Sequence, residues 1–490
     1  MNTPLRRVGL AMMAMILLLL GNATWVQVIN ADDYRKDSRN RRVLLDEYSR
    51  KRGMIIASEG TTIANVQETT DRLRFLRTYA NGAVYAPVTG YFSVTYGTGG
   101  LERTENDLLN GSDDRLFARR VSALITGRDP EGGSVQLSIV PKVQEVAYQQ
   151  LAQKGFKGAV VAMDPKTGAI LAMASTPSYD PNPLASHDGA EQTAAWENYN
   201  AKSAGNPMFN RATGSTEPPG STFKLVVTAA ALADGKTKDD QFTGERQITL
   251  PQTNTTLENF NNTPCGDGVK TSLENALAKS CNTAFAELAG QLGKDKLRKQ
   301  AEKFGIGEKG ETIPLPVAAS DVGPMADLPS VYQTGLGQRD VRMTPLQNAV
   351  VAATIANGGT RMKPYLVDKI LGPGLEPIDE ADPDEVEDAM DKKDADTLRD
   401  MMILSEQNTG GEGRIQGLQI ASKTGTAEHG ENPQQTNPHA WYVAFAPAND
   451  PKIAIAVLVE DGGDRGLGAT GGKVAAPIGR AVMGAYLAGR

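Results

Sequence analysis

Pro218-Pro219-Gly220-Ser221-Thr222-Phe223-Lys224 is the stretch from which the fold of this 490-residue chain is best inferred. Two prolines and a glycine stop regular structure, and an apolar helical run, 222–233, begins directly after them. Ser221 is therefore expected at a helix N-terminus, where Lys224 shares its face. A lysine whose pKa is lowered by burial or a nearby charge can take the proton of a serine hydroxyl. For this motif alone, a capped helix with an exposed lysine is the alternative.

Two further motifs follow Ser221 along the chain. Ser280-Cys281-Asn282 carries a hydroxyl and an amide two residues apart, which suit proton relay and hydrogen bonding to a peptide. Lys423-Thr424-Gly425-Thr426 offers an ammonium and two hydroxyls to a carboxylate, and Gly425 would let a substrate backbone approach a strand. Each pattern is weak alone, because Ser38-Arg39-Asn40 and Lys166-Thr167-Gly168 also match, in a charged stretch and in a predicted turn.

The composition excludes several classes of function. The 58 acidic residues outnumber the 51 basic ones, and no basic stripe typical of a nucleic-acid binder is present. The histidines and cysteines are too few and too scattered along the sequence for a metal centre: His187, His429, His439, Cys265 and Cys281. We therefore expect no metal and no cofactor, with the chemistry carried by Ser, Lys, Thr, Asn, Asp or Glu.

The first segment directs the chain to a membrane. Arg6 and Arg7 precede an apolar run, 8–29, that is just long enough to span a bilayer. The two arginines favour the cytoplasmic side, which would place the rest of the chain outside. Basic residues after the run weaken this charge asymmetry: Arg35, Lys36, Arg39, Arg41 and Arg42. A cleaved signal peptide, with Gly21-Asn22-Ala23 as its cleavage site, is the alternative. Because apolar residues continue to Ile29, we favour a single-pass cell-membrane anchor with the remaining chain extracytoplasmic.

Export changes the interpretation of the two cysteines. In an oxidising compartment a lone pair, Cys265 and Cys281, favours a disulfide that closes a short loop. Such a bond stabilises a protein by roughly 2–4 kcal/mol, mainly by restricting the unfolded chain. Two buried reduced cysteines are the alternative.

Apolar runs outline the domain organisation. A strand and a helix are predicted at 134–139 and 142–154, within an irregular, glycine-punctuated region. Strands are then predicted at 159–163, 169–174, 418–428, 439–447 and 452–460, the first two as a hairpin, and helices at 222–233, 273–292 and 345–356. Strands at both ends with helices between them indicate an α+β fold with one antiparallel sheet flanked by helices. The acidic segment 375–400 lacks the spacing of a calcium loop, so we expect an exposed helix there.

The order Ser-x-x-Lys, Ser-x-Asn, Lys-Thr-Gly resembles the motif set of penicillin-binding proteins and class A β-lactamases. Over nearly its whole length the chain resembles a class B penicillin-binding protein. Further landmarks resemble that family: Arg52-Gly53-Met54-Ile55, Gly99-Gly100-Leu101-Glu102, 158–182, Gly337-Gln338, Thr344-Pro345-Leu346-Gln347 and Asn357-Gly358-Gly359. The Arg-Gly landmark departs from the family pattern. The family usually has an acidic residue before the next glycine, and in this chain the run 56–60 takes its place. The resemblance implies a cytoplasmic tip and transmembrane anchor at 1–30, a pedestal or dimerisation-like domain at 31–156, and a penicillin-binding transpeptidase domain, similar to serine β-lactamases, at 157–490.

The resemblance also implies a peptidoglycan D,D-transpeptidase. Ser221 would attack the D-Ala-D-Ala carbonyl of a stem peptide, release D-alanine and form an acyl-enzyme, which an amine of a neighbouring stem then takes. Lys224 would be the general base, and Ser280, helped by Lys423, would pass the proton to the leaving amine. β-Lactams would acylate Ser221 as well, and division or elongation proteins would be partners.

The remaining motif residues would bind the substrate. By similarity, Asn282 would hold the peptide amide, and Thr424 and Thr426, either side of Gly425, would bind the terminal carboxylate. The backbone N–H groups of Ser221 and Thr426 would form the oxyanion hole. A Cys265–Cys281 disulfide would then fix the second motif beside the site.

Three other functions use the same residues or the same fold. A β-lactamase or β-lactam sensor is one, but no Glu-x-x-Leu-Asn-like loop follows the second motif, and Ser280-Cys281-Asn282 differs from the Ser-x-Val of class D enzymes. A D,D-carboxypeptidase, which passes the acyl group to water, shares every motif. A non-catalytic division scaffold is the third, although all motif residues are present. We see no glycosyltransferase-like region in the sequence, which argues against a bifunctional synthase.

Overall fold

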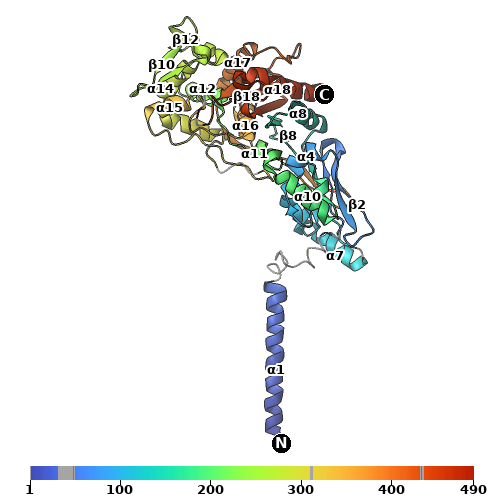
Figure 1. The fold of residues 1–490 in the computed structure, drawn as a ribbon. Coiled ribbons are helices and arrows are strands. Elements are labelled where there is room, and N and C mark those ends of the chain that lie inside the picture. The colour runs from blue at the N-terminus through green and yellow to red at the C-terminus, as the bar shows by residue number, and fades with distance from the viewer. Residues whose placement is uncertain are drawn as a thin grey trace.

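The structure is a computed structural model in which residues 2–30, 48, 50–127, 129–308, 313–430, 432 and 435–489 are described. The basic residues expected after the anchor, 35–42, and the pattern Ser38-Arg39-Asn40 lie outside the described residues. Figure 1 shows the C-terminal part of the chain, in green to red, beside a smaller region built mainly from the blue and cyan N-terminal part.

A five-stranded antiparallel sheet forms the centre of the larger region. Its strand order is β17-β18-β19-β7-β8, so that strands near the C-terminus pair with a hairpin from the middle of the chain. The strands are β17 (Ala421–Ala427), β18 (His439–Ala446), β19 (Ile453–Val459), β7 (Gly158–Met163) and β8 (Ile170–Thr176). The predicted hairpin, the three later strands and the antiparallel sheet are confirmed.

Helices cover both faces of this sheet. α8 (Pro141–Ala152) and α18 (Gly471–Leu487) pack on one face, against Val160, Tyr442 and their alternate neighbours. α16 (Pro345–Ala356) packs on the other face, against the residues in between, such as Val161 and Val443. Successive side chains of a strand point to opposite faces, so a sheet buried on both sides reads as continuous apolar runs. This is why β18 and β19 were readily predicted from the sequence.

A helical subregion lies beside the sheet. It contains α12 (Lys224–Ala233), α13 (Leu273–Lys279), α14 (Asn282–Lys303), α15 (Leu328–Thr334) and α17 (Lys392–Gln407). The prediction of one helix over 273–292 is wrong, because Ser280 has a left-handed backbone (φ 61°) and Cys281 is extended. Both helices bury apolar residues on either side of this turn, which hides the break in the apolar pattern.

A six-stranded mixed sheet forms the smaller region, in the order β15-β14-β6-β1-β2-β3. The strands are β1 (Ile55–Ile56), β2 (Thr62–Glu68), β3 (Phe75–Tyr79), β6 (Ser134–Leu137), β14 (Val367–Leu371) and β15 (Pro377–Glu380). β1 and β6 are parallel, and the other pairs are antiparallel. One edge of this N-terminal sheet is therefore made from residues far along the chain.

The acidic segment 375–400 is mostly not a helix, which corrects the sequence-based expectation. It forms β15 and then β16 (Glu385–Asp388), which pairs with β13 (Thr360–Met362), and α17 starts only at Lys392. All four residues of β16 are exposed, as expected for an acidic surface segment. The strands were missed because backbone pairing to partner strands, rather than side-chain burial, holds them.

Two sequence landmarks of the N-terminal region meet in its core. Glu102 accepts hydrogen bonds from Arg52 Nε at 2.6 Å, Arg77 Nε at 2.6 Å and the Tyr79 hydroxyl at 3.0 Å, and all four side chains are buried. Arg52 also stacks over the ring of Phe92. The arginine of the Arg-Gly landmark and the glutamate of the Gly-Leu-Glu landmark are thus two members of one buried charged cluster.

The first helix is suited to a membrane. α1 (Asn2–Thr24) continues as a π-helical turn, Trp25–Ile29, and residues Pro4–Ile29 have a mean hydropathy of 1.8 over their most apolar window. This helix is long and apolar enough to cross a bilayer. An anchor and a signal peptide both fit this observation.

Candidate active site

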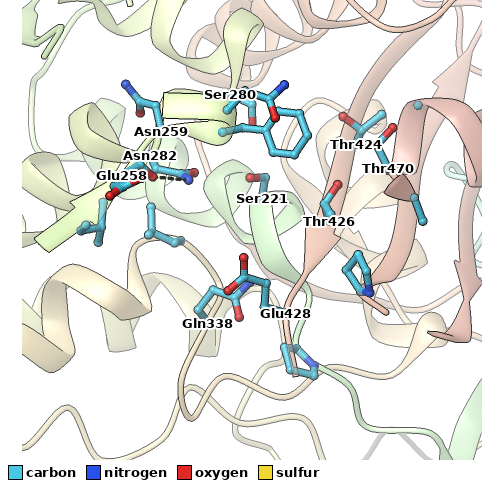
Figure 2. Close-up of a pocket in the computed structure, with 18 of the residues that line it drawn as sticks. Ser221, Glu258, Asn259, Ser280, Asn282, Gln338, Thr424, Thr426, Glu428 and Thr470 are labelled. Carbon is cyan, nitrogen blue, oxygen red and sulfur yellow. Dashed lines mark hydrogen bonds between the residues drawn. The ribbon is translucent and has the colours of Figure 1, made fainter. Parts of the chain in front are cut away.

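The three motifs meet at one cavity of about 1430 Å³ between the edge strand β17 and the helical subregion (Figure 2). Six of the predicted site residues line it: Ser221, Ser280, Asn282, Lys423, Thr424 and Thr426. Lys224 and Gly425 lie behind the wall and contact lining residues. The fold therefore brings together all the residues that the sequence singles out as catalytic or substrate-binding.

Ser221 is presented by a tight turn. The 3₁₀ turn Gly220–Phe223 runs directly into α12, and Ser221 is its only residue that is not buried. Gly220 has a left-handed backbone (φ 54°), and its N–H donates to the carbonyl of Gly337 at 2.9 Å. A Cβ on Gly337 would lie 2.2 Å from the Gly220 oxygen, so this close approach requires glycine.

Lys224 is fully buried beside the turn that carries the second motif. Its Nζ donates to the Ser280 carbonyl at 2.9 Å, to Asn282 Oδ1 at 2.8 Å and to Ser280 Oγ at 3.4 Å. Ser221 Oγ is not among these partners; hydrogen bonds at catalytic groups often tighten only when substrate binds. Burial, together with the charge of Lys423, holds the pKa of Lys224 well below its usual value.

Lys423 reaches the same serine from the opposite side of the cavity. It lies on β17, and its Nζ donates to Ser280 Oγ at 2.9 Å and to the Thr424 carbonyl at 3.0 Å. Burial lowers the pKa of Lys423 to about 7. The Ser280 hydroxyl thus lies within hydrogen-bond distance of two buried lysine amines, and burial lowers the pKa of both.

A disulfide joins the second motif to a neighbouring loop, as expected from the cysteine pair. Cys265 and Cys281 are bonded, with their Cα atoms 6.3 Å apart. Cys281 follows the left-handed Ser280 and precedes the first residue of α14, Asn282, whose Nδ2 donates to the Glu258 carbonyl at 2.9 Å. The turn that carries Ser280 and Asn282 is therefore tied covalently and by hydrogen bonds.

The third motif places alternate residues on opposite sides of β17. The hydroxyls of Thr424 and Thr426 face the cavity (Figure 2) and have no hydrogen-bond partner within the described part of the chain. Gly425 is buried, and a Cβ there would lie 2.7 Å from the Pro219 oxygen and 3.1 Å from the side chain of Trp441. Close packing of β17 against the Ser221 turn and Trp441 therefore requires glycine at this position, and the approach of a substrate backbone to Gly425 stays a prediction.

Two residues that the sequence analysis did not select also line this cavity. Glu428 continues the alternation of Thr424 and Thr426 along the strand, and Gln338 belongs to the Gly337-Gln338 landmark. The alternation was the signal that pointed to Glu428. The sequence marked Gln338 only as part of a family landmark, and the tertiary fold brings it to the cavity.

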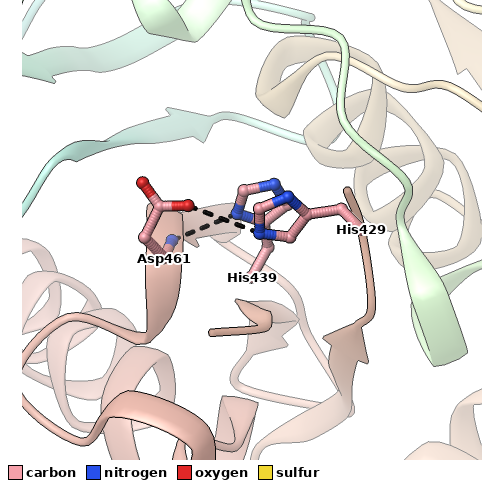
Figure 3. A group of neighbouring side chains, drawn as sticks. All are labelled: His429, His439 and Asp461. Atoms are coloured by element: carbon pink, nitrogen blue, oxygen red, sulfur yellow. Dashed lines mark hydrogen bonds and ion pairs between the residues drawn. The ribbon is translucent and has the colours of Figure 1, made fainter. Parts of the chain in front are cut away.

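Two of the three histidines, which looked scattered in the sequence, lie together beside the cavity (Figure 3). The rings of His429 and His439 stack with centroids 3.7 Å apart. The N–H of Asp461 donates to His439 Nδ1 at 3.2 Å, and the Asp461 carboxylate lies 3.3 Å from His429 Nε2. His439 Nε2 lies 3.2 Å from Glu217, four residues before Ser221.

This histidine group links the nucleophile segment to the sheet. Burial raises the pKa of Glu217, but the hydrogen bond and charge of His439 outweigh it, and the pKa is lowered. Three of the four ring nitrogens have protein partners, since His429 Nε2 also donates to the Asn437 carbonyl at 2.8 Å. We interpret the group as a hydrogen-bonded link that holds the chain before Ser221 against the ends of β17 and β18.

Comparison with known families agrees with this geometry. Residues 158–484 match the penicillin binding protein transpeptidase domain, and residues 52–135 match the penicillin binding protein A dimerisation domain. Peptidoglycan D,D-transpeptidase PbpA of Mycolicibacterium smegmatis is 54% identical over 99% of both chains. PbpA of Mycobacterium tuberculosis strain H37Rv is 51% identical over 100% of both chains.

Solved structures give the same result. The ceftriaxone acyl-enzyme complex of penicillin-binding protein A from M. tuberculosis superposes with a TM-score of 0.88 at 50% identity, covering 90% of this chain and all of that one. Its penicillin G acyl-enzyme complex gives a TM-score of 0.86 at 49% identity, covering 89% of this chain and all of that one. The resemblance inferred from the motifs is confirmed, and the chain belongs to the penicillin-binding protein transpeptidase family.

Proposed function

We propose that this chain is a peptidoglycan D,D-transpeptidase that cross-links stem peptides through an acyl-enzyme on Ser221. The observation that carries the proposal is the Ser280 hydroxyl, which lies between the buried amines of Lys224 and Lys423 in the cavity that Ser221 lines. Such a chain of groups can move a proton from a nucleophile to a leaving amine. The full-length relatives are named for the same activity.

Acylation follows from the arrangement of these groups. The Ser221 oxygen bonds to the carbonyl carbon of the penultimate D-alanine, the amide C–N bond breaks, and D-alanine leaves. Lys224, whose pKa is lowered by burial, takes the serine proton, and Ser280 passes a proton to the leaving nitrogen. Ser280 recovers its proton from Lys224, which lies 3.4 Å away and becomes neutral again, while Lys423 supports Ser280 through their 2.9 Å hydrogen bond.

The substrate is bound on both sides of Ser221. Thr424 and Thr426 offer free hydroxyls to the terminal carboxylate, and the cationic form of Lys423 stabilises it. Asn282 offers its amide to the peptide backbone. The N–H groups of Ser221 and Thr426 bind the oxyanion, a contribution that is typically among the largest in acyl transfer.

Membrane topology and domain roles belong to the same proposal. We assign 1–30 to a cytoplasmic tip and anchor, 31–156 to a pedestal domain and 157–490 to the transpeptidase domain outside the membrane, with division or elongation proteins as partners. Arg6 and Arg7 before the apolar helix support this orientation. β14 and β15 belong to the third range in sequence but pair into the pedestal sheet, which couples the two regions.

Mass spectrometry of the intact protein tests the catalytic proposal. Incubation with benzylpenicillin is expected to add one drug mass that persists for hours, and peptide mapping is expected to locate it on Ser221. Slow deacylation is the expected result because it distinguishes a transpeptidase from a β-lactamase, which turns the drug over. The Ser221→Ala variant is the control and is expected to acquire no adduct.

The same time course separates the rival functions. An adduct that vanishes quickly while penicillin is consumed would indicate a β-lactamase instead. If the folded protein never gains an adduct, the result would indicate a non-catalytic scaffold. With a D-Ala-D-Ala peptide and an acceptor amine, release of D-alanine without any amide product would indicate a carboxypeptidase.

The rate of acylation is expected to fall on both sides of a pH optimum. Above about 7, Lys423 loses the proton that binds the carboxylate, and the rate falls. On the other side of the optimum, protonation of Lys224 removes the base and the rate falls again; the lowered pKa of Lys224 moves this fall to lower pH than for an ordinary lysine. The second-order rate constant for acylation, measured from pH 5 to 10, reports these pKa values of the free enzyme.

The Lys423→Arg variant identifies the group behind the alkaline limb. Arginine stays protonated in this range, so the fall in rate above about 7 is expected to disappear even if the maximum rate is lower. An unchanged alkaline limb in this variant would assign the fall to another group.

A further inference from the structure

A carboxylate at the end of β17 faces the cavity and is not used by the acylation chemistry. Glu428 is the first residue after β17, and it lines the same cavity as Thr424 and Thr426. Figure 2 shows Glu428 beside Gln338, on the part of the cavity wall next to Ser221 and Thr426. Glu428 is therefore well placed to contact a second molecule that approaches the acyl group.

The backbone of Glu428 is fixed by a side chain. With its amide oriented to satisfy both groups, Gln338 donates to the Glu428 carbonyl at 3.1 Å and accepts from the Glu428 N–H at 3.2 Å. The preceding residue, Gly337, accepts a hydrogen bond from Gly220 in the nucleophile turn. Two contacts thus connect the backbone of Glu428 to the turn that carries Ser221, which holds the point from which its side chain extends close to the nucleophile.

The carboxylate of Glu428 has no cationic partner among the residues that the structure describes. Of the other acidic side chains that line the cavity, Glu217 is engaged by His439, and Glu258 lies beside Asn282. Most exposed carboxylates are simply solvated. Glu428 differs because it is fixed by its backbone and directed into the cavity where a second substrate has to enter.

Transpeptidation requires such a contact. The acceptor is a primary amine, which at neutral pH arrives as an ammonium ion. A carboxylate binds an ammonium by charge-assisted hydrogen bonds that water does not fully replace. One proton of the ammonium passes to Lys224, the nitrogen bonds to the acyl carbon, the ester C–O bond breaks, and the second proton that the nitrogen loses passes to the Ser221 oxygen.

We propose that Glu428 binds the ammonium group of the acceptor stem peptide and so directs the acyl group to an amine rather than to water. This inference rests on the proposed transpeptidase function and adds to it a residue that selects the acceptor. Glu428 is a binding residue in this scheme, and acylation of Ser221 by the donor does not require its charge.

The test measures how the acyl-enzyme divides between amine and water. The full-length chain in detergent is given a D-alanyl thioester donor and, as acceptor, a stem tripeptide with a free side-chain amine. The ratio of amide product to hydrolysed donor is followed with increasing acceptor. In the Glu428→Gln variant, this ratio is expected to fall about tenfold, chiefly through weaker acceptor binding.

Matched controls separate this role from a structural one. Glutamine keeps the size of the side chain and the backbone pairing with Gln338, and the rate of benzylpenicillin acylation, which uses no acceptor, serves as the internal reference. Glu258→Gln removes a different carboxylate from the same cavity and is expected to leave the ratio unchanged. Added salt is expected to lower the wild-type ratio more than that of Glu428→Gln.

The outcomes are distinguishable from failure of the proposed function. An unchanged ratio in Glu428→Gln, or an equal fall in Glu258→Gln, would overturn the assignment of Glu428 while the transpeptidase function stands. An equal loss of penicillin acylation in Glu428→Gln would make the residue structural and also overturn it. If the wild-type chain forms no amide product, the transpeptidase proposal itself fails.

Discussion

Replacing Lys224 with alanine is expected to slow the acylation of Ser221 by benzylpenicillin by about 10⁴-fold. Without a base, the serine hydroxyl keeps its proton and is a poor nucleophile. Lys224 suits the role because burial lowers its pKa and its amine lies 3.4 Å from Ser280 Oγ, the next group in the relay. The rate of adduct formation, followed by intact mass at several drug concentrations, measures the effect.

A second substitution tests whether Lys224 acts as a base or only as a hydrogen-bond donor that supports the structure. Lys224 also donates to the Ser280 carbonyl and to Asn282, so alanine removes supporting contacts as well. Lys224→Arg keeps a donor at this site but cannot lose its proton, and it is expected to be nearly as slow as Lys224→Ala. Thermal unfolding checks that both variants are folded. Acylation within tenfold of wild type in Lys224→Arg would reject Lys224 as the base.

Replacing Glu102 with alanine is expected to destabilise the N-terminal sheet by about 3–5 kcal/mol. The substitution leaves Arg52 and Arg77 buried without the Glu102 carboxylate. In the unmodified chain this carboxylate lies 2.6 Å from each of them. The size of the effect comes from these two uncompensated charges rather than from the lost hydrogen bonds alone. Amide hydrogen exchange of peptides that cover 52–79 is expected to accelerate at least 100-fold.

An exposed ion pair in the same region gives the control. Glu131 lies 3.4 Å from Lys51, and both side chains are close to half exposed. Because solvent screens such a pair, Glu131→Ala is expected to change stability by less than about 1 kcal/mol and exchange in 52–79 by only a few fold. Equal effects of the two substitutions would show that burial of the Glu102 cluster is not what stabilises the sheet.

The predicted elements that proved right were those whose signal is local. β18 and β19 are continuous apolar runs because the sheet is covered on both faces, and α16 starts and ends at the residues expected from its apolar run. The break at Ser280 was missed because one left-handed residue changes the chain direction without interrupting the apolar pattern. β15 was missed because its partner, β14, is recognised only once it pairs with the N-terminal sheet.

By itself the sequence determined the residue types of the site and their order along the chain, and it favoured the disulfide that the structure shows. Side-chain chemistry is set by residue type, and the three short motifs carry it within a few positions each. Only the tertiary structure decided that Ser280 lies between Lys224 and Lys423, which are 56 and 143 positions away from it. It alone also decided that both lysines are buried, and that Gln338 holds Glu428 at the cavity. The reason is physical: burial, and with it the lowered pKa of an amine, depends on how distant segments pack, and no local pattern contains that information.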